Sequence, residues 1–320
     1  MYPLSAAGIE AAATRIHDFI HLTPILTSST LNDHFFSLLK NPGAEKPKIY
    51  FKCENFQKTG SFKVRGAANA VLKAQNDQVS GFVTHSSGNH GQALAFAAKK
   101  SGKDCVVVVP ENAPKTKINA IAAYGAEITL VPPTLTARKS KCEEIAKERN
   151  YKIIDPHDDW EVMEGQGTIA IEMNKQIPNL DAVLIATGGG GLASGILQWF
   201  CERNSKVRVF LIEPEGKNIS ESVSAGNRLW TTTEPLDTIA DGVRVRPLGE
   251  KCFQVIKNCN HQSNSDIESA WKLIWERLKI VVEPTAPMPL AALLKYADDF
   301  KDYKNIGVVI CGGNVDFPNQ

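Results

Sequence analysis

The chain has 320 residues, enough for two lobes, and its composition of 43% hydrophobic and 22% charged residues excludes a disordered protein. Its formal net charge of +1 provides no field that would attract nucleic acid or an anionic membrane surface. No apolar run approaches the ~20 residues of a membrane span.

The cysteines give a first indication of the compartment. There are seven of them, an odd number, spread along the chain without a CxxC pair, which favours a reducing environment. The first ten residues lack the basic start and the long apolar core of a secretion signal. We therefore expect a cytoplasmic protein.

In chain order, the first informative elements flank residue 63. Ile49–Cys53 alternates roughly as a strand, and Val64–Ala74 is rich in alanine with apolar residues at helical spacing. Lys63 is thus predicted just inside a helix start, where a lysine can be partly desolvated and lose its proton before bonding to an aldehyde. Taken alone, a solvated lysine on an amphipathic helix is the plainer interpretation.

From residue 80 onward, short β-branched runs alternate with helical patterns, which predicts a parallel sheet with crossover helices. The predicted strands are Gly81–Ser86, Asp104–Pro110, Ala126–Val131, Tyr151–Asp155, Asp181–Thr187, Lys206–Glu213 and Ile306–Cys311. The predicted helices are Asn89–Lys100, Pro114–Tyr124, Gly191–Arg203 and Ser265–Lys279, the last with a capping box of Ser265 and Glu268.

A polar turn, Ser86–Gly91, lies between the first of these strands and its helix. Such a turn presents backbone amides and short polar side chains at a helix N-terminus, which suits a carboxylate or phenolate oxygen. A simple Ser/Asn helix cap is an equally good interpretation of the turn on its own.

Four consecutive glycines, Gly188–Gly191, form a second strand-to-helix turn. Their backbone amides can wrap around a phosphate, and the helix dipole adds partial positive charge. Gly188, Gly190 and Ala193 also match a degenerate dinucleotide fingerprint, with Glu213 as the ribose-binding acid. That nicotinamide oxidoreductase alternative is disfavoured because the turn lies in the middle of the chain and because it leaves Lys63 unexplained.

Together the motifs Ser61–Lys63, Ser86–Gly91, Gly188–Gly191 and Cys311–Asn314 resemble the fold type II pyridoxal phosphate enzymes, in the serine racemase and serine/threonine dehydratase branch. Four further segments carry the same resemblance: Thr23–Pro24, Gly165–Thr168, Ile239–Gly242 and Glu283–Thr285. The resemblance implies an α/β fold of the tryptophan synthase β type with two lobes. Residues 82–154 would form the small lobe, and residues 1–81 and 155–320 the large cofactor-binding lobe of a homodimer.

The resemblance also implies roles for individual residues. Lys63 would bond to pyridoxal 5'-phosphate and then act as acid and base on one face of the substrate α-carbon. The other residues implied to contact the cofactor are Phe62 against the pyridine ring, Asn89 at its phenolic oxygen, Gly188, Gly189, Gly190, Gly191 and Leu192 at its phosphate, and Cys311 near its ring nitrogen. The substrate carboxylate would be held by Ser86, Ser87, Asn89 and His90.

Ser87 bears on the choice of reaction. A racemase returns a proton to the face opposite the one it left, so it needs a second donor, and a hydroxyl at this position resembles the racemase pattern. Dehydratases of the branch commonly carry alanine there. We expect a serine racemase that also eliminates the β-hydroxyl of serine to give pyruvate and ammonia, unless Ser87 merely binds the carboxylate or caps a helix.

The alternatives on the same scaffold are a dehydratase of serine, threonine or 3-hydroxyaspartate, and an aspartate-type racemase. By this resemblance, Arg138 corresponds to a racemase residue that contacts the distal group of the substrate. His157 and Val245 stand where racemases of the branch have an asparagine and a serine. A site that gains a histidine, beside Arg244 and Arg246, suits a more acidic side chain.

Two regulatory sites are implied more weakly. Racemases of the branch hold Mg²⁺ or Ca²⁺ with a glutamate at a strand end and an aspartate six residues later; Glu213 matches the first, but Ile219 stands at the second position. An ATP effector site between subunits is suggested by Ser28, Ser29, Thr30, Lys58, Thr59, Gln92 and Tyr124.

Overall fold

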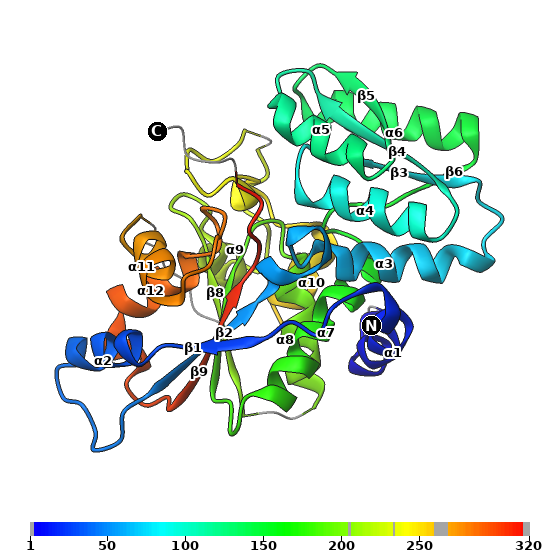
Figure 1. Cartoon of the computed structure of the whole chain (residues 1–320). Coiled ribbons are helices and arrows are strands. Elements are labelled where there is room, and N and C mark those ends of the chain that lie inside the picture. Colours follow the sequence, from blue (N-terminus) through cyan, green and yellow to red (C-terminus); the bar gives the residue numbers. More distant parts are fainter. Residues whose placement is uncertain (1–2, 204–205, 233, 259–267, 316–320) are drawn as a thin grey trace.

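Two β-sheets organise the chain in the computed structural model, which describes residues 3–203, 206–232, 234–258 and 268–315 (Figure 1). The larger sheet has five strands in the order β1-β2-β9-β7-β8. These strands are β1 (Ile25–Thr27), β2 (Lys48–Cys53), β7 (Ala182–Ala186), β8 (Arg208–Ile212) and β9 (Asn305–Ile310). Only β1 runs antiparallel to its neighbour, while β2, β9, β7 and β8 pair in parallel.

The smaller sheet has four parallel strands in the order β5-β4-β3-β6. They are β3 (Gly81–His85), β4 (Asp104–Pro110), β5 (Glu127–Val131) and β6 (Tyr151–Ile153). All four come from one continuous stretch, while the strands of the larger sheet come from both sides of it. The division of the chain into lobes at residues 82 and 154 stays a prediction.

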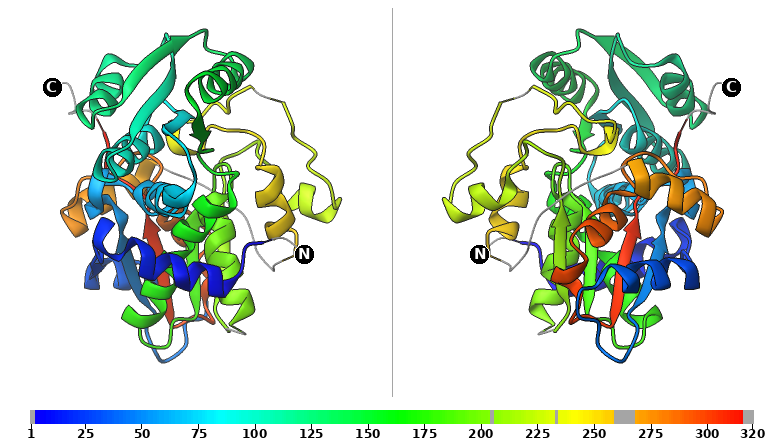
Figure 2. Two further views of the ribbon diagram at one scale, coloured as in Figure 1. Left: turned by 90° about the vertical axis from the view of Figure 1, so that its right-hand side faces the viewer. Right: turned by 90° about the vertical axis from the view of Figure 1, so that its left-hand side faces the viewer.

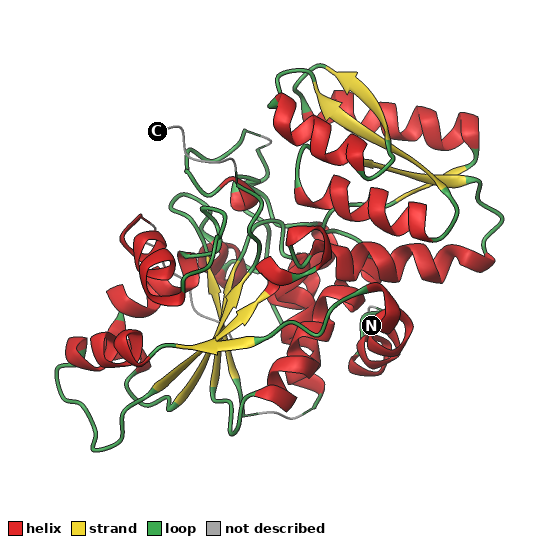
Figure 3. Ribbon diagram, viewed as in Figure 1, coloured by secondary structure: helices red, strands yellow, loops and turns green. Residues whose placement is uncertain are grey.

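Helices cover both faces of the two sheets (Figure 3). The α-helices are α1 (Ala6–Ile16), α2 (Ser29–Leu38), α3 (Lys63–Lys73), α4 (Asn89–Lys100), α5 (Lys115–Ala123), α6 (Leu135–Arg149), α7 (Trp160–Gln176), α8 (Gly191–Glu202), α9 (Ile219–Ser224), α10 (Glu250–Ile256), α11 (Glu268–Leu278) and α12 (Met288–Lys295). The 3-10 helices are η1 (His17–Phe19), η2 (Glu54–Phe56), η3 (Lys58–Gly60), η4 (Ala74–Asn76), η5 (Asp241–Val243) and η6 (Ala297–Phe300).

The continuous apolar runs of the central strands follow from burial on both faces. In β7, Leu184 belongs to the core shared with Leu293 of α12, while its neighbour Val183 belongs to the core shared with Ile196 of α8. Alternate residues therefore serve opposite layers, as the period of a strand requires.

A row of packed helices connects the two sheets. Helix α7 packs against α8 on one side and α3 on the other, and α3 packs against α4 of the smaller sheet. The crossings are close because glycines stand where the backbones meet: a Cβ at Gly165 would lie 2.4 Å from the Arg65 carbonyl oxygen, and one at Gly195 would lie 2.3 Å from that of Met163. Helix α3, which begins at Lys63, is thus fixed between the two sheets.

The α/β fold with mainly parallel sheets confirms the predicted class. The predicted strands and helices from residue 81 to 203 all occur, with ends displaced by at most two residues. The predicted capping box of Ser265 and the Glu268 side chain lies outside the described residues. Within the described part of the chain, no helix combines the length and the apolar character needed to cross a membrane.

Candidate active site

Lys63 is held at the junction between the larger sheet and helix α3. The residues before it are tied to the end of β9: the Phe62 amide donates to the Cys311 carbonyl at 3.1 Å, and Ser61 forms a bridge with Gly312. The Lys63 Nζ donates to the Pro156 carbonyl oxygen at 2.7 Å and lies 5.3 Å from the centre of the Phe62 ring. Backbone pairing thus fixes the amine in one place.

The Lys63 amine is tuned toward its neutral form. Burial lowers its pKa to about 8, although Asp155 opposes that shift, and Cys252, Glu283 and Cys311 act in the same direction as Asp155. A neutral amine is the form that attacks an aldehyde, so the environment suits bonding to a cofactor.

Asp155 lies at the carboxyl end of β6, beside Lys63. Its carboxylate accepts the backbone amides of His157 at 3.0 Å and Asp158 at 2.7 Å, and lies 3.9 Å from His85 Nε2 and 3.7 Å from His157 Nδ1. Burial favours its neutral form, but His157 and the two amides outweigh burial and hold the pKa of Asp155 well below its usual value. Asp155 therefore stays ionised.

Burial favours the neutral form of each histidine in this cluster. Burial lowers the pKa of His85 to about 4 and that of His90 to about 3, and it lowers the pKa of His157 as well. His90 Nε2 lies 3.3 Å from the Ile154 carbonyl oxygen, while its Nδ1 is buried without a partner in the described structure.

The Ser86–Gly91 turn leads from β3 into α4. Helix α4 begins after Gly88 without a side-chain cap, and the Ser86 hydroxyl accepts the Gly88 amide at 3.2 Å. The half-buried Ser87 hydroxyl makes no hydrogen bond with any residue that the structure describes. The interpretation of Ser87 as a helix cap is therefore wrong.

Asn89 is joined to Cys311 through a residue that the sequence analysis did not select. Asn89 Nδ2 donates to Glu283 Oε2 at 2.8 Å, and Cys311 Sγ donates to Glu283 Oε1 at 3.4 Å. Asn89 Oδ1 accepts from Asn314 Nδ2 at 2.9 Å. Burial raises the pKa of Glu283 to about 7, with the Asn89 hydrogen bond opposing it, and raises that of the Cys311 thiol well above its usual value.

The four-glycine turn lies against the segment that follows β6. A Cβ at Gly189 would lie 2.2 Å from the His157 ring. Any residue larger than glycine at this position would therefore collide with the imidazole. Gly190 has φ +102°, a left-handed conformation, and precedes the first turn of the twelve-residue helix α8. The amides at this N-terminus are available to an anion, whereas the Leu192 side chain is buried in the core.

These residues fit pyridoxal phosphate. The neutral-tending Lys63 amine suits its aldehyde, and the helix N-terminus behind Gly188–Gly191 suits its phosphate. Residues 155–157 link these two groups, since Pro156 contacts the lysine and His157 the glycines. The buried Ser61 hydroxyl and His90 Nδ1 lack partners in the described structure, as expected beside a polar ligand.

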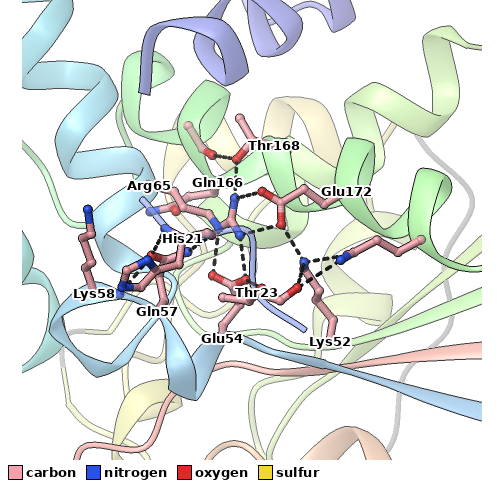
Figure 4. A network of polar contacts seen from close by, with 12 residues as sticks. His21, Thr23, Lys52, Glu54, Gln57, Lys58, Arg65, Gln166, Thr168 and Glu172 are labelled. Atoms are coloured by element: carbon pink, nitrogen blue, oxygen red, sulfur yellow. Dashed lines mark hydrogen bonds and ion pairs between the residues drawn. The ribbon is translucent and has the colours of Figure 1, made fainter. Parts of the chain in front are cut away.

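A buried ionic network contacts the first turn of α3 (Figure 4). The fully buried Arg65 donates to both oxygens of Glu54, at 2.8 and 2.7 Å, and to both oxygens of Glu172, at 2.6 and 2.8 Å. It also donates to Thr168 at 3.1 Å, and Lys52 pairs with Glu172. Two residues after Lys63, the helix is thereby attached to η2 and α7.

Arg138 lies on α6, and its Nε donates to the carbonyl of Thr134, the N-cap residue of that helix, at 3.3 Å. Its charge helps to lower the pKa of His85, so it lies near the histidine cluster. Arg244 and Arg246 likewise donate to backbone carbonyls, those of Thr238 and Gly216. Each of the three arginines expected beside the substrate thus makes a hydrogen bond to the backbone.

The expected divalent cation at Glu213 does not fit the residues present. The carboxylate already accepts the Ile219 amide at 3.1 and 2.8 Å, and the buried ammonium of Lys217 interacts with it electrostatically. Mg²⁺ and Ca²⁺ require several oxygen ligands, and the described residues contain no group of three His, Cys, Asp or Glu that could hold a metal ion. The prediction of a metal at Glu213 is therefore not supported.

The chain belongs to the family of pyridoxal-phosphate dependent enzymes, whose model matches residues 16–312. The serine racemase of Dictyostelium discoideum is 43% identical over 323 residues, which cover 99% of this chain and 96% of that protein. The beta-hydroxyaspartate dehydratase of Paracoccus denitrificans is 38% identical over 322 residues, covering 99% and 98%. The crystal structure of a pyridoxal 5'-phosphate-dependent aspartate racemase matches with a TM-score of 0.92 and 42% identity over 99% of this chain and 97% of that chain.

Family membership confirms the resemblance found in the sequence and makes the chain a pyridoxal-phosphate dependent enzyme. It decides against the nicotinamide interpretation of the glycine turn. Asp155 and Glu283 were missed as site residues, although each carried a signal. Asp155 ends a predicted strand of a parallel sheet, where ligands collect, and Glu283 lies in a segment quoted only as family motif.

Proposed function

We propose that this enzyme interconverts L- and D-serine and also eliminates the β-hydroxyl of serine to form pyruvate and ammonia. The observation that carries the proposal is a pair of proton-transfer groups. One is the Lys63 amine, whose pKa is lowered to about 8, and the other is the Ser87 hydroxyl, which caps no helix. The serine racemases among the relatives support the choice of substrate.

Pyridoxal phosphate would supply an electron sink for the electron pair left on the α-carbon once the substrate amine has replaced Lys63 on it, which leaves the Lys63 amine free. Lys63 Nζ takes the α-proton on one face and holds it, with the Pro156 carbonyl fixing its position. The amides at the start of α4 orient the substrate carboxylate. Ser87 delivers a proton to the opposite face in racemisation, so the two residues exchange roles in the reverse direction.

Elimination begins with the same proton removal. The electron pair then expels the β-hydroxyl, which leaves as water once it has received a proton, and the remaining enamine hydrolyses to pyruvate and ammonia. Lys63 is the proton donor for this leaving group in our proposal, because it holds the proton just removed. The ratio of the two outcomes thus depends on whether Ser87 reprotonates the carbon before the hydroxyl departs.

A second candidate is an acidic substrate, 3-hydroxyaspartate or aspartate, as two of the related proteins suggest by name. The observation in its favour is Arg138, whose side chain donates through Nε to the carbonyl of Thr134, the N-cap residue of α6. Its remaining guanidinium donors suit a second carboxylate. Ionised Asp155 beside Lys63 disfavours that substrate, which is why serine is the first choice.

The test is chiral amino-acid analysis combined with a keto-acid assay on the purified enzyme and on Ser87→Ala. L-serine, D-serine, L-threonine, L-aspartate and 3-hydroxyaspartate serve as substrates. We expect Ser87→Ala to lose racemisation by at least about a hundredfold while it retains elimination of L-serine. Racemisation that survives in Ser87→Ala contradicts the two-face proposal, and higher kcat/KM for an acidic substrate selects the second candidate.

We further propose a cytoplasmic homodimer with an ATP effector site between its subunits. Lys58 and Thr59 of η3 pack near α4, which carries Gln92, and Tyr124 stacks edge-on against Phe96 of α4 at 6.1 Å. Ser28, Ser29 and Thr30 lie instead at the start of α2, which Figure 1 places far from α4 and α5. One nucleotide could contact both groups only if two copies of the chain brought them together.

A further inference from the structure

Lys217 is a buried cation near the larger sheet, four residues after Glu213, where the family resemblance led us to expect a metal ion. It lies between β8, which ends at Ile212, and α9. The side chain is only 2% exposed, and its Nζ donates to the carbonyl oxygens of Val245 at 2.6 Å and Arg246 at 3.0 Å. A buried ammonium with two carbonyl partners requires a compensating negative charge.

Glu213, the nearest buried acidic residue in the sequence, is the candidate for that charge. Its carboxylate is 7% exposed and accepts the amide of Ile219, two residues after Lys217, so both groups are buried in the same short segment. Arg228 and Arg246 line the small hollow next to Lys217, where Arg228 is paired with Glu250.

The carbonyls that Lys217 binds belong to a segment that contacts the glycine turn. The Gly249 amide donates to the Gly189 carbonyl at 3.0 Å, and a Cβ at Gly188 would lie 2.9 Å from the Gly242 carbonyl oxygen. Residues 242–249 thus lie directly on the turn whose amides face the cofactor phosphate. Figure 2 shows the chain running from α9 at the outer edge back to this central position.

We propose that the Lys217 ammonium is a built-in substitute for a divalent cation at Glu213, and that it positions residues 242–249 against the phosphate-binding turn. A metal ion would connect the carboxylate to backbone carbonyls through coordination bonds. The lysine instead holds the two carbonyls by hydrogen bonds and places its positive charge in the same buried segment as Glu213. The enzyme is therefore independent of divalent cations, and the strength of cofactor binding depends on Lys217.

The experiment measures thermal unfolding of the enzyme with saturating pyridoxal phosphate, in EDTA and across a titration of Mg²⁺ and of Ca²⁺. It also measures the dissociation constant of pyridoxal phosphate by absorbance, well below the melting temperature. The variants are Lys217→Met, which keeps the length and removes the charge, and the exposed control Lys206→Met. Leu31→Ala, a buried residue of α2, controls for a general loss of stability.

We expect the wild-type melting temperature to be the same in EDTA and in either metal. Lys217→Met should melt about 4 °C or more below Lys206→Met and bind the cofactor about tenfold more weakly. Leu31→Ala should lower the melting temperature without changing the dissociation constant of pyridoxal phosphate. These readouts use no amino-acid substrate, so they are separate from the proposed reaction.

A saturable rise in the wild-type melting temperature with Mg²⁺ or Ca²⁺ would overturn the proposal, because a cation would then bind despite Lys217. Equal cofactor affinity in Lys217→Met and Lys206→Met would refute the positioning role. Should Lys217→Met fail to fold, the metal titration of the wild type still decides whether Lys217 replaces the cation.

Discussion

At the scale of single residues, burial sets the chemistry of this enzyme more than local sequence does. Lys63 and Glu283 both lie in the site, and the same low-dielectric surroundings favour the neutral form of each. Near neutral pH a fraction of the Lys63 amine is therefore neutral, and the Glu283 carboxyl is partly protonated.

The first prediction concerns Lys63 in cofactor-free enzyme. Only the neutral amine bonds to an aldehyde, so the rate of pyridoxal phosphate incorporation should rise with pH and level off above about pH 8, where the lowered pKa lies. Stopped-flow absorbance measures that rate. Lys63→Ala should show no borohydride-trapped cofactor on peptide mapping, whereas Lys58→Ala should label normally; labelling of another lysine would contradict the assignment.

The second prediction concerns Glu283. Its pKa rises from 4.5 to about 7 on folding, so the folded state keeps a proton that the unfolded state releases between those values. The contribution of Glu283 to the free energy of unfolding is fully present below pH 4.5 and is lost as the pH rises through 7. Relative to the wild type, Glu283→Gln should gain about 3 kcal/mol in unfolding free energy across that range.

Urea unfolding at several pH values measures this difference, and effects of other titrating groups cancel between the two proteins. A constant difference between Glu283→Gln and the wild type from pH 4.5 to pH 8 would show that the carboxyl titrates normally.

At the scale of elements, the start of α3 depends on the ionic network around Arg65. The network joins η2, α3 and α7 through a guanidinium that is completely buried, as Figure 4 shows. A buried charge that loses its partner is costly, whereas an exposed pair contributes little.

We therefore predict that Arg65→Met destabilises the protein by about 3–5 kcal/mol, because the buried Glu54 loses its ion-pair partner and Glu172 keeps only Lys52. Urea unfolding gives the magnitude. The matched control is Arg149→Met, which breaks the exposed pair with Glu127 and should leave the midpoint almost unchanged. Equal effects of the two substitutions would mean that the buried network adds nothing beyond an exposed ion pair.

The contact between the glycine turn and the segment after β6 leads to a fourth prediction. Gly189→Ala places a methyl group 2.2 Å from the His157 ring, so either the turn or the imidazole must move. Cofactor affinity should fall about tenfold or more, and a second substitution, His157→Ala, should restore most of it. Additive effects in this double-mutant cycle, measured by cofactor titration, would rule out direct contact as the cause.

At the scale of the whole molecule, two sheets and the row of helices α8, α7, α3 and α4 give the site its framework. Lys63 is contributed by α3, the polar turn Ser86–Gly91 follows a strand of the smaller sheet, and the four-glycine turn follows a strand of the larger sheet. Three segments more than twenty residues apart in the chain thereby meet at one place.

The fifth prediction belongs to this scale. Light scattering after size exclusion should give the mass of a dimer, and ATP should change the rate of serine turnover with saturation. Lys58→Ala and Ser29→Ala should each weaken the response to ATP, since the two residues approach the nucleotide from different subunits. A monomer that responds fully to ATP would contradict an intersubunit site.

The sequence by itself determined the fold class, the main strands and helices, and the cofactor. It did so because strand and helix periodicities are local, and because Lys63, the Ser86–Gly91 turn and the four glycines each occupy a short segment. The family match confirms the cofactor assignment that these motifs carried.

Only the tertiary structure decided which charged groups meet. Asp155, Glu283 and Lys217 are ordinary residues in the sequence, and their importance follows from burial beside partners far along the chain. Lys217 lies 28 residues from Val245, yet its ammonium binds that carbonyl and interacts with Glu213. Desolvation and long-range pairing are properties of the packed molecule, so a local pattern cannot encode them.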